Sequence, residues 1–277
     1  MILFHDVDGC LNTPDGADIP ASLDALTPRQ RSILSELSRL VDQSAISDFV
    51  LNTGRGWQET GFLVEAIAST KLSYVLVEHG AIMWDVKRGT TVDLQALAKR
   101  YGLDEISEQF NSVNRVRTLI KWFVDEGSAC LSEKLKHQGT LVPHGGKEVS
   151  LTISVPALLD GGLLLSTLRQ LIESQTEFSP DHFVYHHGIS DGFIDVTGAI
   201  DKGTGVTVLA RHLGKELADT MAIGNGLNDL PMLEAVGLPI CPANAEQPVK
   251  RLCQARGLVS NHNYINAALE WLKRQVP

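Results

Sequence analysis

The amino-acid sequence predicts an α/β protein with a Rossmann-like parallel-sheet core, helices on both faces of the sheet, and an inserted α+β domain. Apolar runs of strand length alternate with helical segments over residues 1–84, which is typical of a parallel sheet. Strands are grouped over residues 85–195, as in an α+β domain. We therefore expect a core built from residues 1–84 and 196–277 and an inserted domain of residues 85–195.

The first predicted strand, residues 2–4, is apolar and ends at Asp6, Asp8 and Gly9. In open α/β sheets, ligands bind at the carboxyl ends of the strands. Two aspartates one residue apart would repel each other in a dry site, so they need a cation, a shared proton or solvent. Alternatively, Asp8-Gly9 is only a turn and Asp6 only a helix cap. The motif alone favours neither interpretation, and other strand ends must decide.

The second predicted strand, residues 48–52, follows a helix that begins at Thr27-Pro28 and is itself followed by Thr53-Gly54. A hydroxyl and a glycine at this position can present O–H and backbone N–H groups to an anion. An ordinary strand-to-helix turn has the same pattern. A helix over residues 57–70 and a third strand over residues 74–77 complete the first half of the core.

The inserted domain is expected to combine helices with an antiparallel sheet. Residues 148–155 alternate polar and apolar side chains with period two, as in a sheet with one solvated face. The other predicted elements are helices over residues 93–101, 105–126 and 163–173 and a strand over residues 183–187. Residues 193–197 are expected to lead back to the core.

The returning core segment carries two further polar clusters. Lys202 precedes a helical run, where it could simply be a solvated charge, and the apolar strand 220–223 ends in Gly-Asn-Gly-Leu-Asn-Asp, residues 224–229. Glycine with small polar residues thus follows three predicted strands of one sheet. The remaining expected elements are strands over residues 238–241 and 258–259 and helices over residues 247–253 and 263–274.

Composition favours a soluble protein with a small-molecule partner. The 277 residues are 43% hydrophobic and 21% charged, with a net charge of −9. This charge argues against binding to nucleic acid or to an anionic membrane surface. The four cysteines lack metal-site or disulfide spacing, so reduced thiols and a cytoplasmic location are expected, without a signal peptide or membrane span. A monomer and a homodimer are both compatible with the sequence.

The polar clusters at residues 6–10, 53–55, 202 and 224–229 resemble, in order, the four motifs of the haloacid dehalogenase superfamily of phosphatases. The insertion is similar in place and length to the large α/β (C2-type) cap of the Cof-type and sucrose-phosphatase-like branches. The resemblance covers the whole chain, and the ordered set of motifs is more specific than any one of them.

The resemblance implies a role for each matching residue. Asp6 would be the nucleophile that forms an aspartyl-phosphate, and Asp8 would protonate the leaving alcohol and then activate water. Thr53 and the Gly54 N–H would hold the phosphoryl oxygens, and Lys202 would offset their charge.

The resemblance also implies a Mg²⁺ cofactor, held by Asp6, the backbone carbonyl of Asp8 and the last motif, with Asp229 supporting these ligands. The last motif usually reads Gly-Asp-x-x-Asn-Asp, but this chain has Asn225 in place of the first Asp. An amide oxygen can ligate the ion, although one negative charge fewer should weaken binding. Loss of catalysis, and conversion to Asp by deamidation of Asn225-Gly226, are the alternatives.

Function is therefore expected to be Mg²⁺-dependent hydrolysis of a small phosphate ester, either a sugar phosphate or a phosphorylated carboxylic acid. The cap would select the substrate, with Lys147, His186 and His187 as candidate contacts from their positions alone. One rival is a phosphomutase of the same superfamily. The other is a phosphate-ester-binding or regulatory protein whose metal site is weakened at Asn225.

Overall fold

The computed structural model describes residues 1–186 and 192–276. The chain divides into two compact units, one formed by Met1–Leu103 with Asp201–Pro277 and the other by Asp104–Ile200. Each unit has its own sheet and its own buried apolar core. No helix in the described ranges is long and apolar enough to span a membrane.

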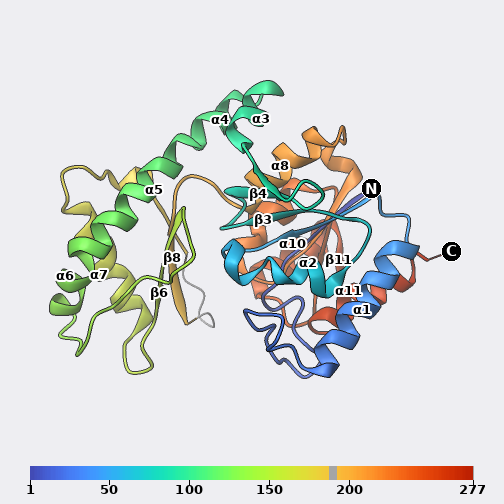
Figure 1. The fold of residues 1–277 in the computed structure, drawn as a ribbon, viewed down its shortest axis with the longest axis horizontal. Coiled ribbons are helices and arrows are strands. Elements are labelled where there is room, and N and C mark those ends of the chain that lie inside the picture. The colour runs from blue at the N-terminus through green and yellow to red at the C-terminus, as the bar shows by residue number, and fades with distance from the viewer. Residues whose placement is uncertain (187–191, 277) are drawn as a thin grey trace. The chain divides into compact units, whose positions relative to one another are not determined.

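The first unit is built on an eight-stranded sheet with the order β11-β10-β9-β1-β2-β3-β4-β5 in the described residues (Figure 1). The strands from β11 to β3 are parallel, and β4 and β5 are antiparallel additions at one edge. The strands are β1 (Ile2–His5), β2 (Asp48–Asn52), β3 (Leu72–Val77), β4 (Ile82–Asp85), β5 (Thr90–Val92), β9 (Thr220–Ile223), β10 (Leu238–Cys241) and β11 (Leu258–Val259). The predicted parallel core is confirmed.

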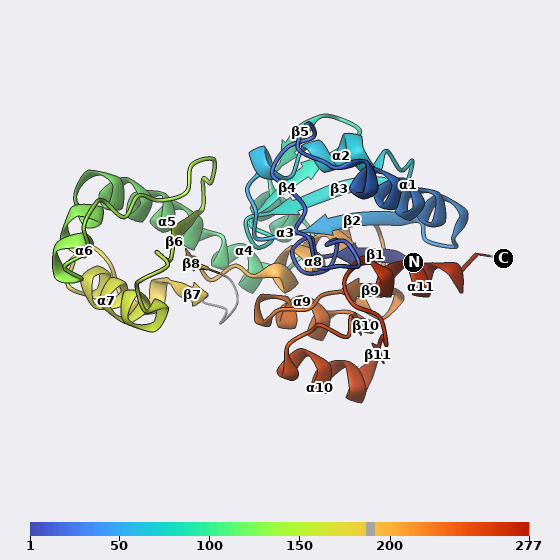
Figure 2. The same cartoon turned by 90° about the horizontal axis from the view of Figure 1, so that it is seen from below.

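Helices cover both faces of this sheet, and α1 and α8 lie on opposite sides of it (Figures 1 and 2). The helices are α1 (Pro28–Gln43), α2 (Phe62–Ile67), α3 (Leu94–Arg100), α8 (Lys202–His212), α9 (Leu230–Ala235), α10 (Gln247–Arg256) and α11 (Ile265–Lys273). The 3-10 turns are η1 (Trp57–Glu59), η4 (Leu217–Asp219) and η5 (Leu227–Asp229). The single helix expected over residues 57–70 is instead η1 and α2, because Thr60, with a φ angle of −123°, interrupts the helical backbone between them.

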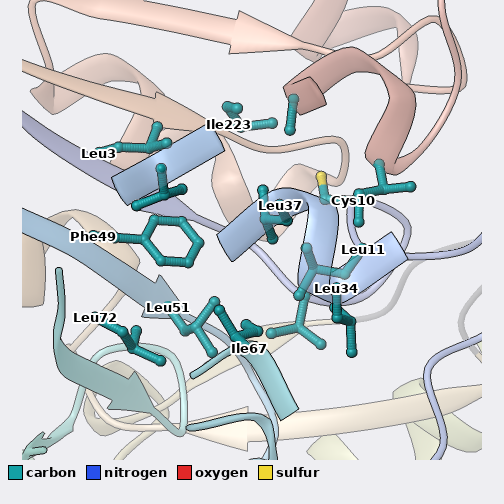
Figure 3. Close-up of a cluster of buried hydrophobic side chains, with 14 of the residues drawn as sticks. Leu3, Cys10, Leu11, Leu34, Leu37, Phe49, Leu51, Ile67, Leu72 and Ile223 are labelled. Atoms are coloured by element: carbon teal, nitrogen blue, oxygen red, sulfur yellow. The ribbon is translucent and has the colours of Figure 1, made fainter. Parts of the chain in front are cut away.

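One face of the central strands forms the main apolar core with α1, α2 and α11 (Figure 3). Leu3 and Phe49 point to this face, where Leu34 and Leu37 of α1 meet them (Figure 3). Because successive strand residues point to opposite faces, Phe4 is buried on the other side of the sheet. Strand β1 is thus covered on both faces, and its polar residues begin only where it ends.

The second unit contains a three-stranded antiparallel sheet with the order β6-β8-β7 in its described part. Its elements are α4 (Asp104–Gln109), α5 (Asn111–Trp122), a π-helical turn (Phe123–Gly127), α6 (Ser128–Lys134), β6 (Ser150–Ser154), α7 (Gly161–Glu173), η3 (Pro180–His182), β7 (Val184–His186) and β8 (Phe193–Thr197). Leu151 and Ile194 join the helices in one apolar core, so the predicted α+β character of the insertion is confirmed.

The units divide at residues 103/104 and 200/201 rather than at the expected 84/85 and 195/196. Strand β4 turns back to pair with β3, with Ile82 opposite Val77, and β5 then pairs with β4. The chain therefore remains in the first sheet past residue 85. At the other end, β8 pairs with β6 and β7, so residues 193–197 belong to the second unit instead of leading back to the core.

Candidate active site

The centre of the candidate site is a buried lysine between two carboxylates. Lys202 Nζ donates to Asp6 Oδ1 at 2.6 Å and to Asp229 Oδ1 at 2.5 Å. The side chains of Lys202 and Asp229 are 0% exposed and that of Asp6 is 5% exposed. Asp6 and Lys202, which are 196 positions apart in the chain, are thus brought into direct contact, as the strand-end argument predicts.

Local structure fixes Lys202 at the start of α8. Asp201 caps this helix by accepting from the Thr204 N–H at 2.8 Å, a common way to satisfy a free helix-end donor. Asn52, the last residue of β2, donates from Nδ2 to the Lys202 carbonyl oxygen at 3.1 Å. The lysine is therefore held by its own helix and by the neighbouring strand.

Asp229 organises the loop that follows β9. Its Oδ2 accepts the backbone N–H groups of Asn225 at 2.8 Å and Gly226 at 2.9 Å. A Cβ on Gly224 would lie 2.6 Å from Asp229 Cβ, so glycine is needed for this close approach. Both Asp229 oxygens are engaged, which suits the predicted supporting role better than direct metal ligation. The Gly226 N–H contact also opposes deamidation, because this nitrogen would attack the Asn225 side chain.

Asp8 lies closer to solvent, with 55% of its side chain exposed. Arg55 binds its carboxylate in a forked arrangement, with Nη2 at 2.6 Å from Oδ1 and Nε at 3.0 Å from Oδ2. The same guanidinium donates to the carbonyl oxygens of Ile19 at 2.7 Å and Pro20 at 3.0 Å. Arg55 therefore joins the predicted acid/base residue to the loop over residues 12–20.

Thr53 and Gly54 form the turn after β2, one strand away from Asp6. Thr53 is buried, and its Oγ1 accepts the Arg55 N–H at 3.1 Å. A Cβ on Gly54 would lie 2.7 Å from the His79 ring. Glu78 and His79 both have positive φ angles, 50° and 60°, a strained backbone that often occurs at functional sites. His79 N–H donates to the Thr53 carbonyl oxygen at 3.0 Å, so this strained turn supports the Thr53 loop.

Oxygen-bearing groups of Asp6 and Asp8 after β1 and of Asn225 after β9 lie close together. One end of the Asn225 amide lies 2.7 Å from the Asp8 carbonyl oxygen and 3.3 Å from Asp6 Oδ2. Neighbouring oxygens of an octahedral Mg²⁺ shell are about 2.9 Å apart, because each Mg–O bond is about 2.0–2.1 Å. A carboxylate, a carbonyl and an amide oxygen at these spacings fit Mg²⁺. The set of Asp6, the Asp8 carbonyl and Asn225 contains only one carboxylate side chain. In the described residues, no group of three or more His, Cys, Asp or Glu side chains is placed to hold a metal ion.

Burial controls the protonation of the site. Burial and the nearby charges of Asp229 and Asp8 together raise the pKa of Asp6 to about 8, although Lys202 opposes the rise. Burial disfavours the charged form of Lys202, but Asp229 and Asp6 together raise the pKa of this ammonium above its usual value. Lys202 therefore remains charged at neutral pH, and a bound cation would favour the ionised form of Asp6.

The candidate cap residues are only partly described. Lys147 Nζ donates to Thr152 Oγ1 at 2.6 Å and pairs with Asp195 Oδ1 at 3.3 Å, and 6% of its side chain is exposed. His186 Nε2 lies 3.0 Å from Thr197 Oγ1. His187 lies outside the described residues. Lys147, in the loop before β6, is thus bound to side chains of β6 and β8, and the substrate contacts expected of these three residues stay predictions.

The sequence argument assigned no role to Arg55 or to His79, although both directly contact the predicted site loops. Arg55 follows Thr53-Gly54, and a lone arginine at a helix start is usually a solvated charge. Two signals were present in the sequence: the cation stands one residue after a predicted anion-binding turn, and Glu78-His79-Gly80 follows the third strand. Neither signal identifies a partner, because both contacts depend on how separate loops meet.

The fold resembles those of solved structures over nearly its full length. A Thermoplasma acidophilum protein, 0175, aligns with a TM-score of 0.63 and 19% identity, covering 99% of this chain and 96% of that one. Sucrose-phosphatase from Synechocystis, solved with sucrose and phosphate, aligns with a TM-score of 0.63 and 14% identity, covering 99% and 97%. At these identities the likeness shows the fold: a parallel-sheet α/β core with an inserted cap, as predicted.

The chain belongs to the family of haloacid dehalogenase-like hydrolases, whose model matches residues 3–272. It is 49% identical over 53 residues to a phosphoglycolate phosphatase of Methanopyrus kandleri, covering 19% of this chain and 23% of the relative. The phosphoglycolate phosphatase of Methanoculleus marisnigri is 37% identical over 81 residues, covering 29% and 33%. These matches span only about a quarter to a third of either relative. The predicted family is confirmed.

Proposed function

We propose that this protein is a Mg²⁺-dependent phosphatase that hydrolyses a small phosphorylated metabolite through an aspartyl-phosphate on Asp6. The observation that carries the proposal is the buried Asp6–Lys202–Asp229 cluster, with contacts of 2.6 and 2.5 Å. A nucleophile for a phosphate dianion must lie among positive charges, because the two anions otherwise repel. Lys202 supplies one such charge inside the protein.

In the first proposed step, an Asp6 carboxylate oxygen attacks phosphorus while the bond from phosphorus to the leaving oxygen breaks, and Asp8 gives its proton to that oxygen. In the second step, the Asp8 carboxylate removes a proton from water as the water oxygen attacks the aspartyl-phosphate. The bond between phosphorus and Asp6 then breaks, which releases inorganic phosphate and restores both carboxyl groups to their starting protonation.

The remaining residues would stabilise charge on the transferred group. Thr53 and the Gly54 N–H would bind phosphoryl oxygens, and Lys202 would offset their charge. Asp6, the Asp8 carbonyl and Asn225 would hold Mg²⁺, with Asp229 supporting the loop of Asn225. Bound Mg²⁺ would supply a second positive charge beside the reacting oxygens.

The proposed substrates are phosphorylated carboxylic acids and sugar phosphates. Partial sequence relatives named phosphoglycolate phosphatase support the first class, and the fold likeness to a sucrose-phosphatase is compatible with the second. We assign substrate selection to residues 104–200, with Lys147, His186 and His187 as candidate contacts. In this assignment Lys147 acts partly by holding Asp195, with which it pairs.

A second candidate function is binding of phosphate esters without efficient turnover. The observation that favours it is Asn225, which leaves Asp6 as the one carboxylate in the proposed metal set. Fewer negative ligands lower the affinity for Mg²⁺, and a site that is rarely loaded would bind esters but hydrolyse them slowly.

Release of inorganic phosphate separates the two functions. The purified protein is incubated with 2-phosphoglycolate and a panel of sugar phosphates, in Mg²⁺ or in EDTA. We expect Mg²⁺-dependent release that Asp6→Asn lowers by at least about a thousandfold, since the variant lacks the nucleophile. Asp15→Asn, at an exposed carboxylate paired with Arg29, is the matched control and should keep full activity. Release that survives in Asp6→Asn, or no release from any ester, would reject the phosphatase proposal.

A further inference from the structure

Asn225 occupies a position where an amide can interact in two ways. The inward end of its amide faces two acceptors, the Asp8 carbonyl oxygen at 2.7 Å and Asp6 Oδ2 at 3.3 Å. An amide nitrogen in this place donates to both, whereas an amide oxygen would lie 2.7 Å from the Asp8 carbonyl oxygen with no proton between them. The two ends of an amide are nearly equal in shape, so either orientation fits the same space.

We propose that Asn225 acts as an amide switch: its NH₂ group takes the place of the cation in the metal-free site, and the amide turns over to offer its oxygen when Mg²⁺ binds. The inference deepens the proposed function and rests on its use of Mg²⁺. It explains how the metal-free site avoids three converging oxygen atoms. It also predicts that Mg²⁺ binding must break the two hydrogen bonds that the nitrogen makes.

The surroundings of Asn225 are compatible with both orientations. Cys10 Sγ lies 3.1 Å from the inward end of the amide. A thiol is a weak donor and its sulfur a weak acceptor, which lets Cys10 contact either an oxygen or a nitrogen. A carboxylate or a lysine at residue 10 would favour one orientation.

Glycine at residue 9 leaves room for the amide. Gly9 has a φ angle of +73°, and a Cβ there would lie 2.4 Å from the outward end of the Asn225 amide. Asn225 also has its main chain fixed, because its N–H donates to Asp229 Oδ2 at 2.8 Å and its carbonyl oxygen accepts from Glu246 N–H at 2.9 Å. The backbone is therefore held while the end of the side chain can rotate.

Replacing Asn225 by Asp should destabilise the metal-free protein and strengthen its binding of Mg²⁺. In EDTA the carboxylate faces two acceptors without a donor, so Asn225→Asp should lower the thermal midpoint below that of the wild type. In Mg²⁺ the added charge should strengthen binding by at least about tenfold, and Mg²⁺ should raise the midpoint of the variant more than that of the wild type. Asn261→Asp adds the same charge at an exposed position and should change neither quantity.

Thermal unfolding in EDTA and across a Mg²⁺ titration is the decisive experiment, and it does not require catalysis. A lower midpoint for Asn225→Asp in EDTA together with a larger Mg²⁺-induced rise supports the switch. An unchanged or higher midpoint in EDTA, or an equal Mg²⁺ response in both proteins, overturns it. If Mg²⁺ stabilises neither protein, the Mg²⁺ dependence of the proposed function fails as well, which distinguishes that failure from failure of the switch alone.

NMR of the wild-type side chain provides a second measurement that holds even if Asn225→Asp does not fold. In EDTA the Asn225 NH₂ protons should exchange slowly with water, because both are bonded to acceptors in the site. Adding Mg²⁺ should increase their exchange at least about tenfold as the nitrogen turns outward. Exchange that is fast in EDTA, or that Mg²⁺ does not change, contradicts the switch.

Discussion

His5, directly before the proposed nucleophile, is buried in its neutral form. Its side chain is 0% exposed, and Nδ1 lies 2.5 Å from the Asp6 carbonyl oxygen. Nε2 is buried without a hydrogen-bond partner in the described residues. Burial lowers the pKa of His5 to about 4 despite the contact with the Asp6 backbone. The histidine is thus a core residue, and protonating it in the folded protein costs free energy.

This burial predicts a pH dependence of stability. The pKa of this histidine is about 6.5 in the unfolded chain and about 4 in the folded protein. As the pH falls from 6.5 to 4, the unfolded chain binds a proton that the folded protein does not, so the free energy of unfolding decreases. Between pH 6.5 and pH 4 we expect His5 to lower the free energy of unfolding by on the order of 3 kcal/mol. Urea unfolding in EDTA from pH 7 to pH 4.5 measures it as the difference between the wild type and His5→Gln. Taking that difference is necessary because the raised pKa of Asp6 acts in the opposite direction over the same range.

His262→Gln is the matched control, because 53% of the His262 side chain is exposed. This variant should follow the pH dependence of the wild type. A constant difference in unfolding free energy between the wild type and His5→Gln at every pH would contradict the burial argument.

Residue-level prediction from the sequence succeeded where backbone topology alone determines proximity. Asp6 and Asp229 follow neighbouring strands, and Lys202 begins the helix that packs on them, so their meeting follows from a parallel sheet. The contact of Arg55 with Asp8 does not follow, because a long side chain can reach many partners. The orientation of the Asn225 amide depends on acceptors within 3.3 Å, which no sequence pattern specifies.

At the scale of elements, Arg55 fastens the loop over residues 12–20 to the end of β2. Its guanidinium contacts the carbonyl oxygens of Ile19 and Pro20 and the Asp8 carboxylate at once. Its side chain is 15% exposed, so these hydrogen bonds are partly shielded from water. A planar guanidinium presents five N–H donors in a rigid fork, whereas an ammonium presents three on one atom and cannot bind a carboxylate in the same forked way. Weakening the Arg55 contacts should therefore increase the mobility of both the Asp8 side chain and the loop over residues 12–20.

Arg55→Lys tests this coupling by limited proteolysis with proteinase K. We expect cleavage within residues 12–20 to accelerate about tenfold, which corresponds to about 1.4 kcal/mol of lost anchoring. Arg29→Lys is the control, because Arg29 contacts Asp15 on the same loop with both side chains more than half exposed. Such surface pairs contribute little, so its cleavage rate should match the wild type. Equal rates for all three proteins would show that Arg55 does not anchor the loop.

Element boundaries were harder to predict than element types. The antiparallel pairing of β4 with β3 was not predicted, since hydrophobic pattern does not specify a partner strand. Residues 193–197 are apolar enough for either sheet, and only their register with β6 and β7 assigns them to the second unit. Strand pairing between residues far apart in the sequence therefore explains why the observed boundaries of the units differ from the predicted ones.

At the scale of the whole molecule, each of the two units has a buried apolar core among its described residues. Leu168 of α7 is fully buried in the core of the second unit with Leu151 and Ile194. Leu37 of α1 is fully buried in the core of the first unit with Leu3 and Phe49. Units with their own cores can open independently, with free energies that differ from one another.

Leu168→Ala should therefore destabilise one unit selectively. Removing a buried leucine side chain typically costs about 2–5 kcal/mol, through lost burial and the cavity left behind. Hydrogen exchange should accelerate at the amides of β6 and β8, while those of β1 and β2 keep wild-type rates. Leu37→Ala, the same substitution in the other core, should give the reverse pattern. If either variant accelerates exchange equally in both sheets, the two units unfold as one cooperative structure.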